Sequence, residues 1–255
     1  MALIRCEFFS EALELSTSMT VILPERAEGR IGVAGWPTVE EPPVLYLLHG
    51  LSDDDGIWLR RTSIERYAAP LGLAVVMPQV HRSFYTDQAC GGRYWTFLSE
   101  ELPELVASFF RVSQRPEDTF VAGLSMGGYG AFKWALRRPG AFAAAASLSG
   151  VMDVARLQRD GVFPDVLRTT FGDASVAGTD EDLLHLLDES EPAGLPRLYL
   201  CCGTEDDLLD DNRRFIDAAR RRGVDLVFDL DPGGHEWGYW DAHIRDVLDW
   251  LPLER

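Results

Sequence analysis

The sequence predicts an α/β domain in which a mostly parallel sheet of about eight strands is covered by helices on both faces. Short apolar, β-branched runs bounded by glycine or proline recur along the chain, which is typical of buried strands. From residue 44 onward these runs alternate with helix-forming segments, as in a parallel sheet covered on both sides. With 255 residues and 46% hydrophobic content, residues 1–255 are expected to form a single domain.

The expected elements follow in chain order. The strands are predicted at 5–10, 19–23, 44–48, 73–77, 119–124, 143–148, 195–202 and 226–230. Helices are predicted at 57–69, 100–110, 129–136, 212–222 and 243–251. The first two strands should form an antiparallel pair, and a loop rich in Gly, Pro and Glu at 27–43 should follow them.

The segment 151–192 interrupts this alternation. It is longer than an ordinary connection between a strand and a helix. Short helices are expected within it at 164–171 and 181–187. We therefore expect a small cap-like insertion at 151–192 that roofs a site and helps to set its specificity.

Charge and composition narrow the class of protein. The formal charge of −17, from 24 basic and 41 acidic residues, argues against nucleic acid or an anionic membrane surface as a partner. The cysteines, Cys6, Cys90, Cys201 and Cys202, lack the spacing of a metal site and are expected to be free thiols. No apolar stretch is long enough to cross a membrane, so a cytoplasmic protein is expected. The sequence leaves homo-oligomerisation open.

A serine lies between glycines directly after a predicted strand and directly before a predicted helix. The segment is Gly123-Leu124-Ser125-Met126-Gly127. A strand-to-helix turn this sharp crowds side chains against neighbouring backbone, so it needs glycine on both sides of the serine. This G-x-S-x-G pattern is typical of a nucleophile elbow, which exposes the serine hydroxyl. Ser125 is therefore the candidate nucleophile.

A serine nucleophile needs a base, and the base needs a group that orients it. His235 lies in a glycine-rich loop after the last predicted strand, at the same sheet edge as Ser125. The orienting acid should come between them in the chain. Asp206 and Asp207 both follow the strand at 195–202, and their spacing does not separate them. Asp153, after the preceding strand, is the alternative.

The tetrahedral intermediate of acyl transfer needs two hydrogen-bond donors for its oxyanion. The backbone N–H of Met126, directly after the nucleophile, is the first expected donor. The second should come from the loop after the strand at 44–48, where Gly50 lets the backbone approach closely and Leu51 supplies the N–H. His49 is expected to brace this loop.

These motifs resemble the esterase D-like group of α/β-hydrolases, and most closely its small tributyrin and acetyl esterases. S-formylglutathione hydrolases and mycolyltransferases look like relatives. The segments that carry the resemblance span nearly the whole chain and are 46–52, 76–78, 84–87, 101–103, 122–130, 202–206 with Leu208, and 234–237 with 239–240. The family pattern after the seventh strand implies that the acid is Asp206 rather than Asp207. S-formylglutathione hydrolases usually carry His where this chain has Leu124 and Tyr129, so the esterase branch fits better.

The resemblance implies a serine carboxylesterase that hydrolyses short acyl esters, from acetyl to butyryl and including acetylated sugars, through an acyl-enzyme. Its substrate is a small-molecule ester, and no cofactor or metal is implied. Aromatic residues are expected to wall a short acyl pocket, and the substrate-binding candidates are His49, Trp58, Tyr85, Trp95, Trp237 and Trp240. The alternatives are a thioester hydrolase, such as one acting on S-formylglutathione, and a non-catalytic binding module on the same fold.

Overall fold

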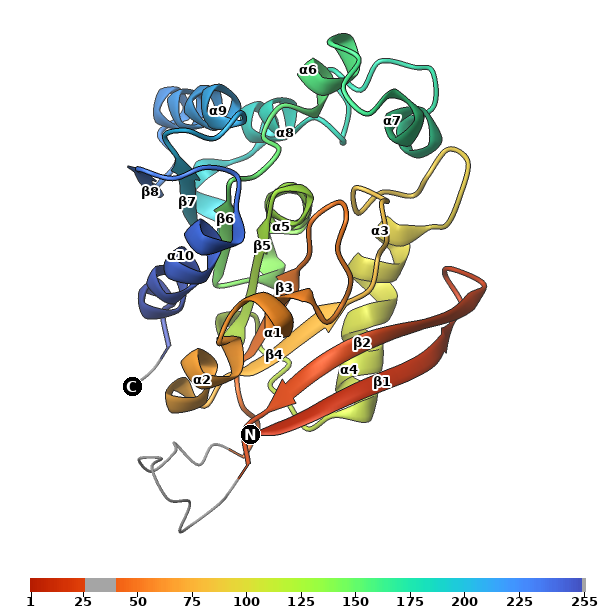
Figure 1. Ribbon diagram of the computed structural model, residues 1–255, viewed down its shortest axis with the longest axis vertical. Helices are drawn as coiled ribbons and strands as arrows, with labels where there is room; N and C mark the ends of the chain where they lie inside the picture. The colour runs from red at the N-terminus through yellow and green to blue at the C-terminus, as the bar shows by residue number, and fades with distance from the viewer. Residues whose placement is uncertain (26–39, 254–255) are drawn as a thin grey trace.

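The computed structural model describes residues 1–25 and 40–253, and from residue 44 onward its strands and helices alternate (Figure 1). The strands are β1 (Ala2–Ser10), β2 (Leu15–Leu23), β3 (Val44–Leu48), β4 (Ala74–Pro78), β5 (Thr119–Leu124), β6 (Ala144–Leu148), β7 (Arg197–Gly203) and β8 (Leu226–Asp231). The helices are α1 (Ile57–Arg61), α2 (Ile64–Ala68), α3 (Tyr94–Thr96), α4 (Leu102–Phe109), α5 (Met126–Arg137), α6 (Val154–Arg159), α7 (Pro164–Phe171), α8 (Leu183–Glu189), α9 (Leu209–Arg222) and α10 (Trp237–Trp250).

The strands form one 8-stranded sheet in the order β1-β2-β4-β3-β5-β6-β7-β8. The β1–β2 hairpin joins β4 in antiparallel fashion, and the strands from β4 to β8 are mutually parallel. The carboxyl ends of these parallel strands therefore meet at one edge, where α/β proteins assemble their sites. This arrangement is the α/β-hydrolase fold and confirms the predicted fold class.

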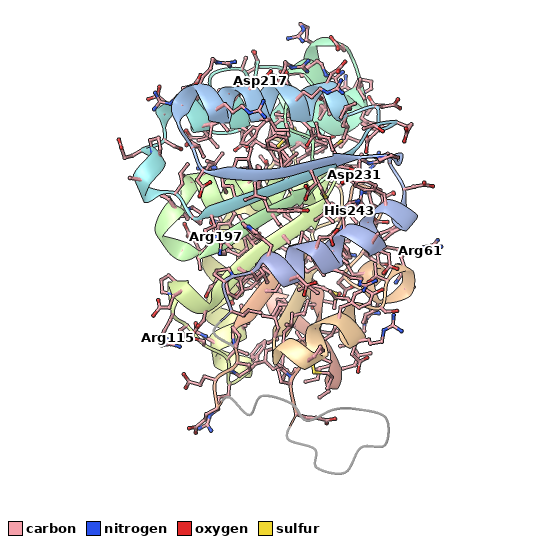
Figure 2. All side chains as sticks on the ribbon, turned by 90° about the vertical axis from the view of Figure 1, so that its left-hand side faces the viewer. Arg61, Arg115, Arg197, Asp217, Asp231 and His243 are labelled. Carbon is pink, nitrogen blue, oxygen red and sulfur yellow. The ribbon has the colours of Figure 1, made fainter. Side chains whose placement is uncertain are left out.

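Side chains that alternate along the buried strands divide the core into two layers. On β3, Tyr46 and Leu48 belong to the core layer that also contains residues of α4, α5 and α9, whereas Leu45 and Leu47 belong to the layer with residues of α1, α2 and α10. Figure 2 shows the two layers edge-on: Asp217 on α9 and His243 on α10 lie on opposite sides of the edge strand β8. Covering both faces explains why every residue of β3, β4 and β6 is buried.

The structure departs from the predicted elements at a few places. The helix expected at 57–69 is divided into α1 and α2, because the Thr62 hydroxyl bonds to the Trp58 carbonyl and accepts from the Ile64 N–H. Helix α10 begins at Trp237 rather than at residue 243, so the aromatic cluster after His235 is helical and not part of a loop. Most of the loop predicted at 27–43 lies outside the described residues.

Three helices occupy the segment 151–192. Helix α8 packs between α5 and α9 and buries Leu183 and Leu187, so it belongs to one helix layer of the sheet. Helices α6 and α7 lie at the top of Figure 1, away from the sheet. Within residues 1–25 and 40–253, no helix is both long and apolar enough to cross a bilayer.

Candidate active site

Ser125 occupies the turn between β5 and α5 with a φ of +53°, a conformation that few non-glycine residues adopt. The turn is held by the Ser125 N–H, which donates to the Leu148 carbonyl on β6 at 2.9 Å. A Cβ on Gly127 would lie 2.4 Å from the Leu48 carbonyl oxygen of β3, so only glycine fits there. Tight packing of α5 against the sheet thus sustains the strained serine, as expected of a nucleophile elbow.

His235 and Asp206 complete a chain of hydrogen bonds from Ser125. The Nε2 atom of His235 lies 3.0 Å from the Ser125 Oγ, and its Nδ1 lies 2.8 Å from the Asp206 Oδ2. The other oxygen of Asp206 accepts the Leu208 N–H at 2.8 Å, which fixes the carboxylate plane. Burial raises the pKa of Asp206, but the hydrogen bond and charge of His235 and the Leu208 N–H outweigh it, and the pKa lies below its usual value. Asp206 is therefore ionised and able to orient the imidazole.

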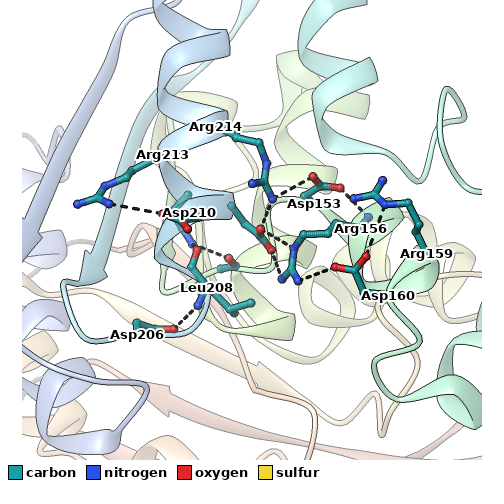
Figure 3. Close-up of polar contacts among 12 residues, drawn as sticks. Asp153, Arg156, Arg159, Asp160, Asp206, Leu208, Asp210, Arg213 and Arg214 are labelled. Carbon is teal, nitrogen blue, oxygen red and sulfur yellow. Dashed lines mark hydrogen bonds and ion pairs between the residues drawn. The ribbon is translucent and has the colours of Figure 1, made fainter.

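The two other candidate acids lie elsewhere. Asp207 is exposed at the rim of the pocket. Asp153 caps α6 by accepting the Arg156 N–H at 2.8 Å and pairs with Arg214 at 3.2 Å (Figure 3). Its carboxylate thus belongs to the ion-pair cluster that joins α6 to α9. Of the three candidate acids, Asp206 is the one that contacts His235, and Asp207 and Asp153 do not.

The loop after β3 passes beside the serine, and its contacts orient the Leu51 N–H. The carbonyl of Gly50 accepts the Asp53 N–H at 3.2 Å and lies 2.7 Å from the His49 Nδ1. Because the N–H of a trans peptide points away from its carbonyl, these contacts turn the Leu51 N–H in the opposite direction. A Cβ on Gly50 would lie 3.8 Å from the Ser125 Cβ, so this loop runs directly past the elbow.

His49 is the brace of this loop, and its two backbone partners define its tautomer. The Val80 N–H donates to Nε2 at 3.1 Å, so that nitrogen carries no proton. The Gly50 carbonyl can only accept, so Nδ1 is the donor. Complete burial lowers the pKa of His49, although its contact with Gly50 and the charge of Asp53 oppose the shift. A neutral imidazole therefore holds the peptide that bears the Leu51 N–H.

The other expected donor, Met126, is the first residue of α5. The first N–H groups of a helix have no partner inside the helix, and they lie at the positive end of its dipole. The Met126 N–H therefore suits a developing negative charge next to Ser125.

A pocket of about 840 Å³ opens onto the serine. Its apolar lining comes from both the sheet edge and the segment 151–192 and consists of Leu51, Phe84, Leu124, Met126, Val151, Leu157, Val162, Phe163, Leu208, Trp237 and Trp240. The ring of Trp240 meets His235 edge-on with a centroid distance of 4.9 Å, and Trp237 packs on Trp240 at 5.2 Å. The aromatic wall beside the histidine is thus itself supported by packing.

Four of the six residues predicted to bind substrate do not line this pocket. His49, Trp58, Tyr85 and Trp95 are between 0% and 7% exposed. Trp58 donates to the Leu48 carbonyl, Tyr85 donates to the His49 carbonyl, and Trp95 packs over Arg137. These side chains support the site from behind, so substrate contact is not supported for them. Trp237 and Trp240 do line the pocket.

Several pocket residues were absent from the sequence-based candidates. Val151, Leu157, Val162 and Phe163 come from the segment 151–192, and Arg82 comes from the loop after β4. Their signal is weak, because an irregular segment has no hydrophobic period that would indicate which side chains face inward. Among the described residues, no group of three or more His, Cys, Asp or Glu side chains could hold a metal ion.

A family model described as "Putative esterase" matches residues 10–251, nearly the whole chain. The chain belongs to this esterase family. This esterase is 30% identical to an acetyl esterase of Caldicellulosiruptor saccharolyticus, with 98% of each chain covered. It superposes on the substrate-bound fluorophosphonate-binding serine hydrolase F of Staphylococcus aureus with a TM-score of 0.88, 37% identity and 98% of each chain covered. An S-formylglutathione hydrolase of the same organism gives a TM-score of 0.85 at 37% identity, again over 98% of each chain. The esterase is therefore a serine hydrolase.

Proposed function

We propose that this esterase is a carboxylesterase that hydrolyses short-chain acyl esters, from acetyl to butyryl, through an acyl-enzyme on Ser125. The observation that carries the proposal is the chain of hydrogen bonds from Ser125 through His235 to Asp206. The Ser125 end of this chain opens onto the pocket. Its spacing is that of a nucleophile, a general base and an orienting acid.

In the proposed reaction, the Ser125 Oγ attacks the acyl carbon as its proton passes to the Nε2 of His235. Asp206 stabilises the resulting imidazolium. The imidazolium then gives its proton to the leaving alcohol as the ester C–O bond breaks, which leaves an acyl group on Ser125. Water repeats the sequence, with His235 again as base, and releases the carboxylic acid. In both halves, the N–H groups of Leu51 and Met126 would stabilise the oxyanion.

The pocket supports a small acyl group joined to a larger alcohol. A volume of about 840 Å³ lies in the usual range for small-molecule sites and exceeds what an acetyl group needs. The supported wall of Trp237 and Trp240 leaves little freedom for a long chain next to His235. Acetylated sugars therefore fit the proposal, and the acetyl esterase relative is consistent with it.

The proposal is tested with p-nitrophenyl esters of increasing chain length and with acetylated sugars. Specificity, measured as kcat/KM, should peak between acetyl and butyryl. Ser125→Ala should lower kcat by about 10⁴- to 10⁶-fold without changing the fold. Ser52→Ala is the matched control, because Ser52 is exposed in the same pocket. A folded Ser125→Ala protein within about tenfold of wild type would rule out the proposed nucleophile.

Thioester hydrolysis is the second candidate, because an S-formylglutathione hydrolase shares 37% identity with this chain. The charged residues that line the pocket weigh against glutathione. Three acidic residues other than Asp206 line the pocket with two arginines, and these residues are Asp53, Asp207, Glu236, Arg82 and Arg156. Asp211 already binds Arg156 through two contacts of 2.7 Å. The pocket is thus poorly suited to the carboxylates of glutathione. A higher kcat/KM for S-acyl glutathione than for the matching oxygen ester would favour the second candidate.

A further inference from the structure

The sequence has 24 lysine and arginine residues, and Lys133 is the only lysine among them. It lies on α5, about two turns after Ser125. Its side chain is 0% exposed. A buried ammonium is costly unless each of its protons finds an acceptor. The only lysine of the chain thus occupies a buried position, where a compact cation fits better than the larger guanidinium of arginine.

All three ammonium protons of Lys133 have partners. They go to the Tyr85 carbonyl at 2.9 Å, to the Thr86 hydroxyl at 2.8 Å and to the Glu181 carboxylate. Glu181 lies in the insertion, directly before α8, and its Oε2 also accepts the Tyr129 hydroxyl at 3.1 Å. A single cation thus joins α5, the loop after β4 and the insertion. A planar guanidinium is larger and would not present three converging donors in this space.

The loop segment that Lys133 binds is a strained turn. Phe84 and Tyr85 have φ values of +49° and +52°. For residues with a bulky side chain, each such conformation is unfavourable. The bond from Lys133 to the Tyr85 carbonyl lies inside this turn and offsets part of that cost. The turn therefore depends on contacts that the surrounding helices provide.

The two side chains of the turn reach two parts of the candidate site. Phe84 lines the pocket. The Tyr85 hydroxyl donates to the His49 carbonyl at 2.8 Å, in the loop that carries the Leu51 N–H. The Tyr85 ring lies directly on α5, because a Cβ on Gly130 would meet it at 2.4 Å. The ring is thus clamped between the helix and the oxyanion loop.

We propose that Lys133 is a positioning residue that holds Tyr85 in place, so that the Tyr85 hydroxyl fixes the loop bearing the Leu51 oxyanion donor. Because Lys133 also binds Glu181, the segment 151–192 contributes to holding the same oxyanion loop. This inference rests on the proposed function, because the Leu51 N–H has this role only in acyl transfer. Lys133 itself lies behind the loop and does not touch the substrate.

The first test replaces Tyr85 with Phe, which removes the hydroxyl and leaves the ring that packs on α5. The kcat for p-nitrophenyl acetate should fall by about 10- to 100-fold, less than the 10²- to 10³-fold typical of losing a donor itself. KM should stay within about twofold, because the loop acts on the transition state. The Ki of a trifluoromethyl ketone, which forms a tetrahedral adduct with the serine, should rise by the same factor as kcat/KM falls.

Tyr199→Phe is the matched control. It removes another buried tyrosine hydroxyl, one that bonds to Asp229 at the β8 edge of the sheet. The Tm of Tyr199→Phe should fall about as much as that of Tyr85→Phe, while the kcat and Ki of Tyr199→Phe stay close to wild type. A merely structural role for Tyr85 would make the two variants alike. Unchanged kcat and Ki in Tyr85→Phe, or equal losses in both variants, would overturn the proposal.

The second test acts on the cation. The double variant Lys133→Met/Glu181→Gln removes both charges, so that no lone charge remains buried. It should reproduce the fall in kcat and the rise in Ki of Tyr85→Phe, and adding Tyr85→Phe to it should cost little more, because the three residues act in series. Fully additive losses would show that Lys133 does not act through Tyr85. Ser125→Ala, measured in parallel, tests the proposed function independently: if that variant stays active, the proposed function fails, whatever the other variants do.

Discussion

Replacing Asp206 with Asn should almost abolish catalysis, although the side chain keeps its shape. The Leu208 N–H donates to Oδ1, so the introduced amide must direct its oxygen there and its NH₂ toward His235. The Nδ1 of His235 would then have to accept, which moves its proton to Nε2. An Nε2–H can donate to Ser125 but cannot take the serine proton. The substitution thus selects the wrong tautomer.

The magnitude follows from this inversion. In serine hydrolases the same change of tautomer costs about 10⁴-fold in kcat, which corresponds to about 5.4 kcal/mol of activation free energy. Asp207→Asn is the control, because that side chain is exposed and next in sequence. It should leave kcat within about threefold, as expected of a surface substitution. The assay is steady-state hydrolysis of p-nitrophenyl acetate, with circular dichroism to verify folding. Equal effects of the two variants, or a large loss only in Asp153→Asn, would refute the assignment of the acid.

Three further outcomes are expected. Gly127→Ala should lower Tm and cost about 1–3 kcal/mol of folding free energy, because its methyl group would lie 2.4 Å from the Leu48 carbonyl oxygen; an unchanged thermal scan would contradict this packing. Phe163→Ala should raise the relative kcat/KM for octanoyl over acetyl esters with little change in Tm, because this pocket residue is 51% exposed; an unchanged chain-length profile would exclude it from the acyl wall. Burial lowers the pKa of Lys133 to about 8; the charges of Glu181 and Asp87 oppose this shift, and the charge of Arg137 adds to it. The kcat should therefore decline as pH rises through about 8, and the Lys133→Met/Glu181→Gln variant should lack this decline.

The pH dependence of stability has the opposite sign for the same lysine. Its pKa in the folded protein, about 8, is below its ordinary value of 10.5. Between these values the unfolded chain binds more protons, so this group by itself makes the free energy of unfolding increase with pH. A fall in kcat over that interval therefore cannot arise from unfolding driven by Lys133. Chemical denaturation at pH 7.5 and 9.5, with and without the lysine, measures this contribution.

The sequence predicts the sheet and the position of Ser125 because both depend on short-range patterns. Runs of buried strand residues and the glycines around Ser125 are local requirements of their backbone. His235 could be placed because parallel strands bring their carboxyl ends together. The choice between Asp206 and Asp207 needed more, because neighbouring residues on a loop differ only in the direction of their side chains.

The aromatic residues show where sequence reasoning reaches its limit. A tryptophan or tyrosine in a loop after a strand can face the pocket or support it from behind, and the pattern is the same. Trp58 and Tyr85 proved to be buried supports, each with its polar group on a backbone carbonyl. The pair of Lys133 and Glu181 is 48 positions apart and joins separate elements, so only the folded chain reveals it.

Because Lys133 is the only lysine of the sequence, cleavage after lysine can report the opening of α5. A protease that cuts only after lysine has one site in the whole sequence, and that site lies on α5 and is fully buried. Cleavage into fragments 1–133 and 134–255 therefore requires this helix to open, and its rate measures how often the helix that follows the candidate nucleophile opens. For the same reason, amine-reactive dyes and acylating agents find no lysine side chain on the folded surface. If the proposed acyl-enzyme chemistry holds, its activated acyl groups thus meet no exposed lysine to modify.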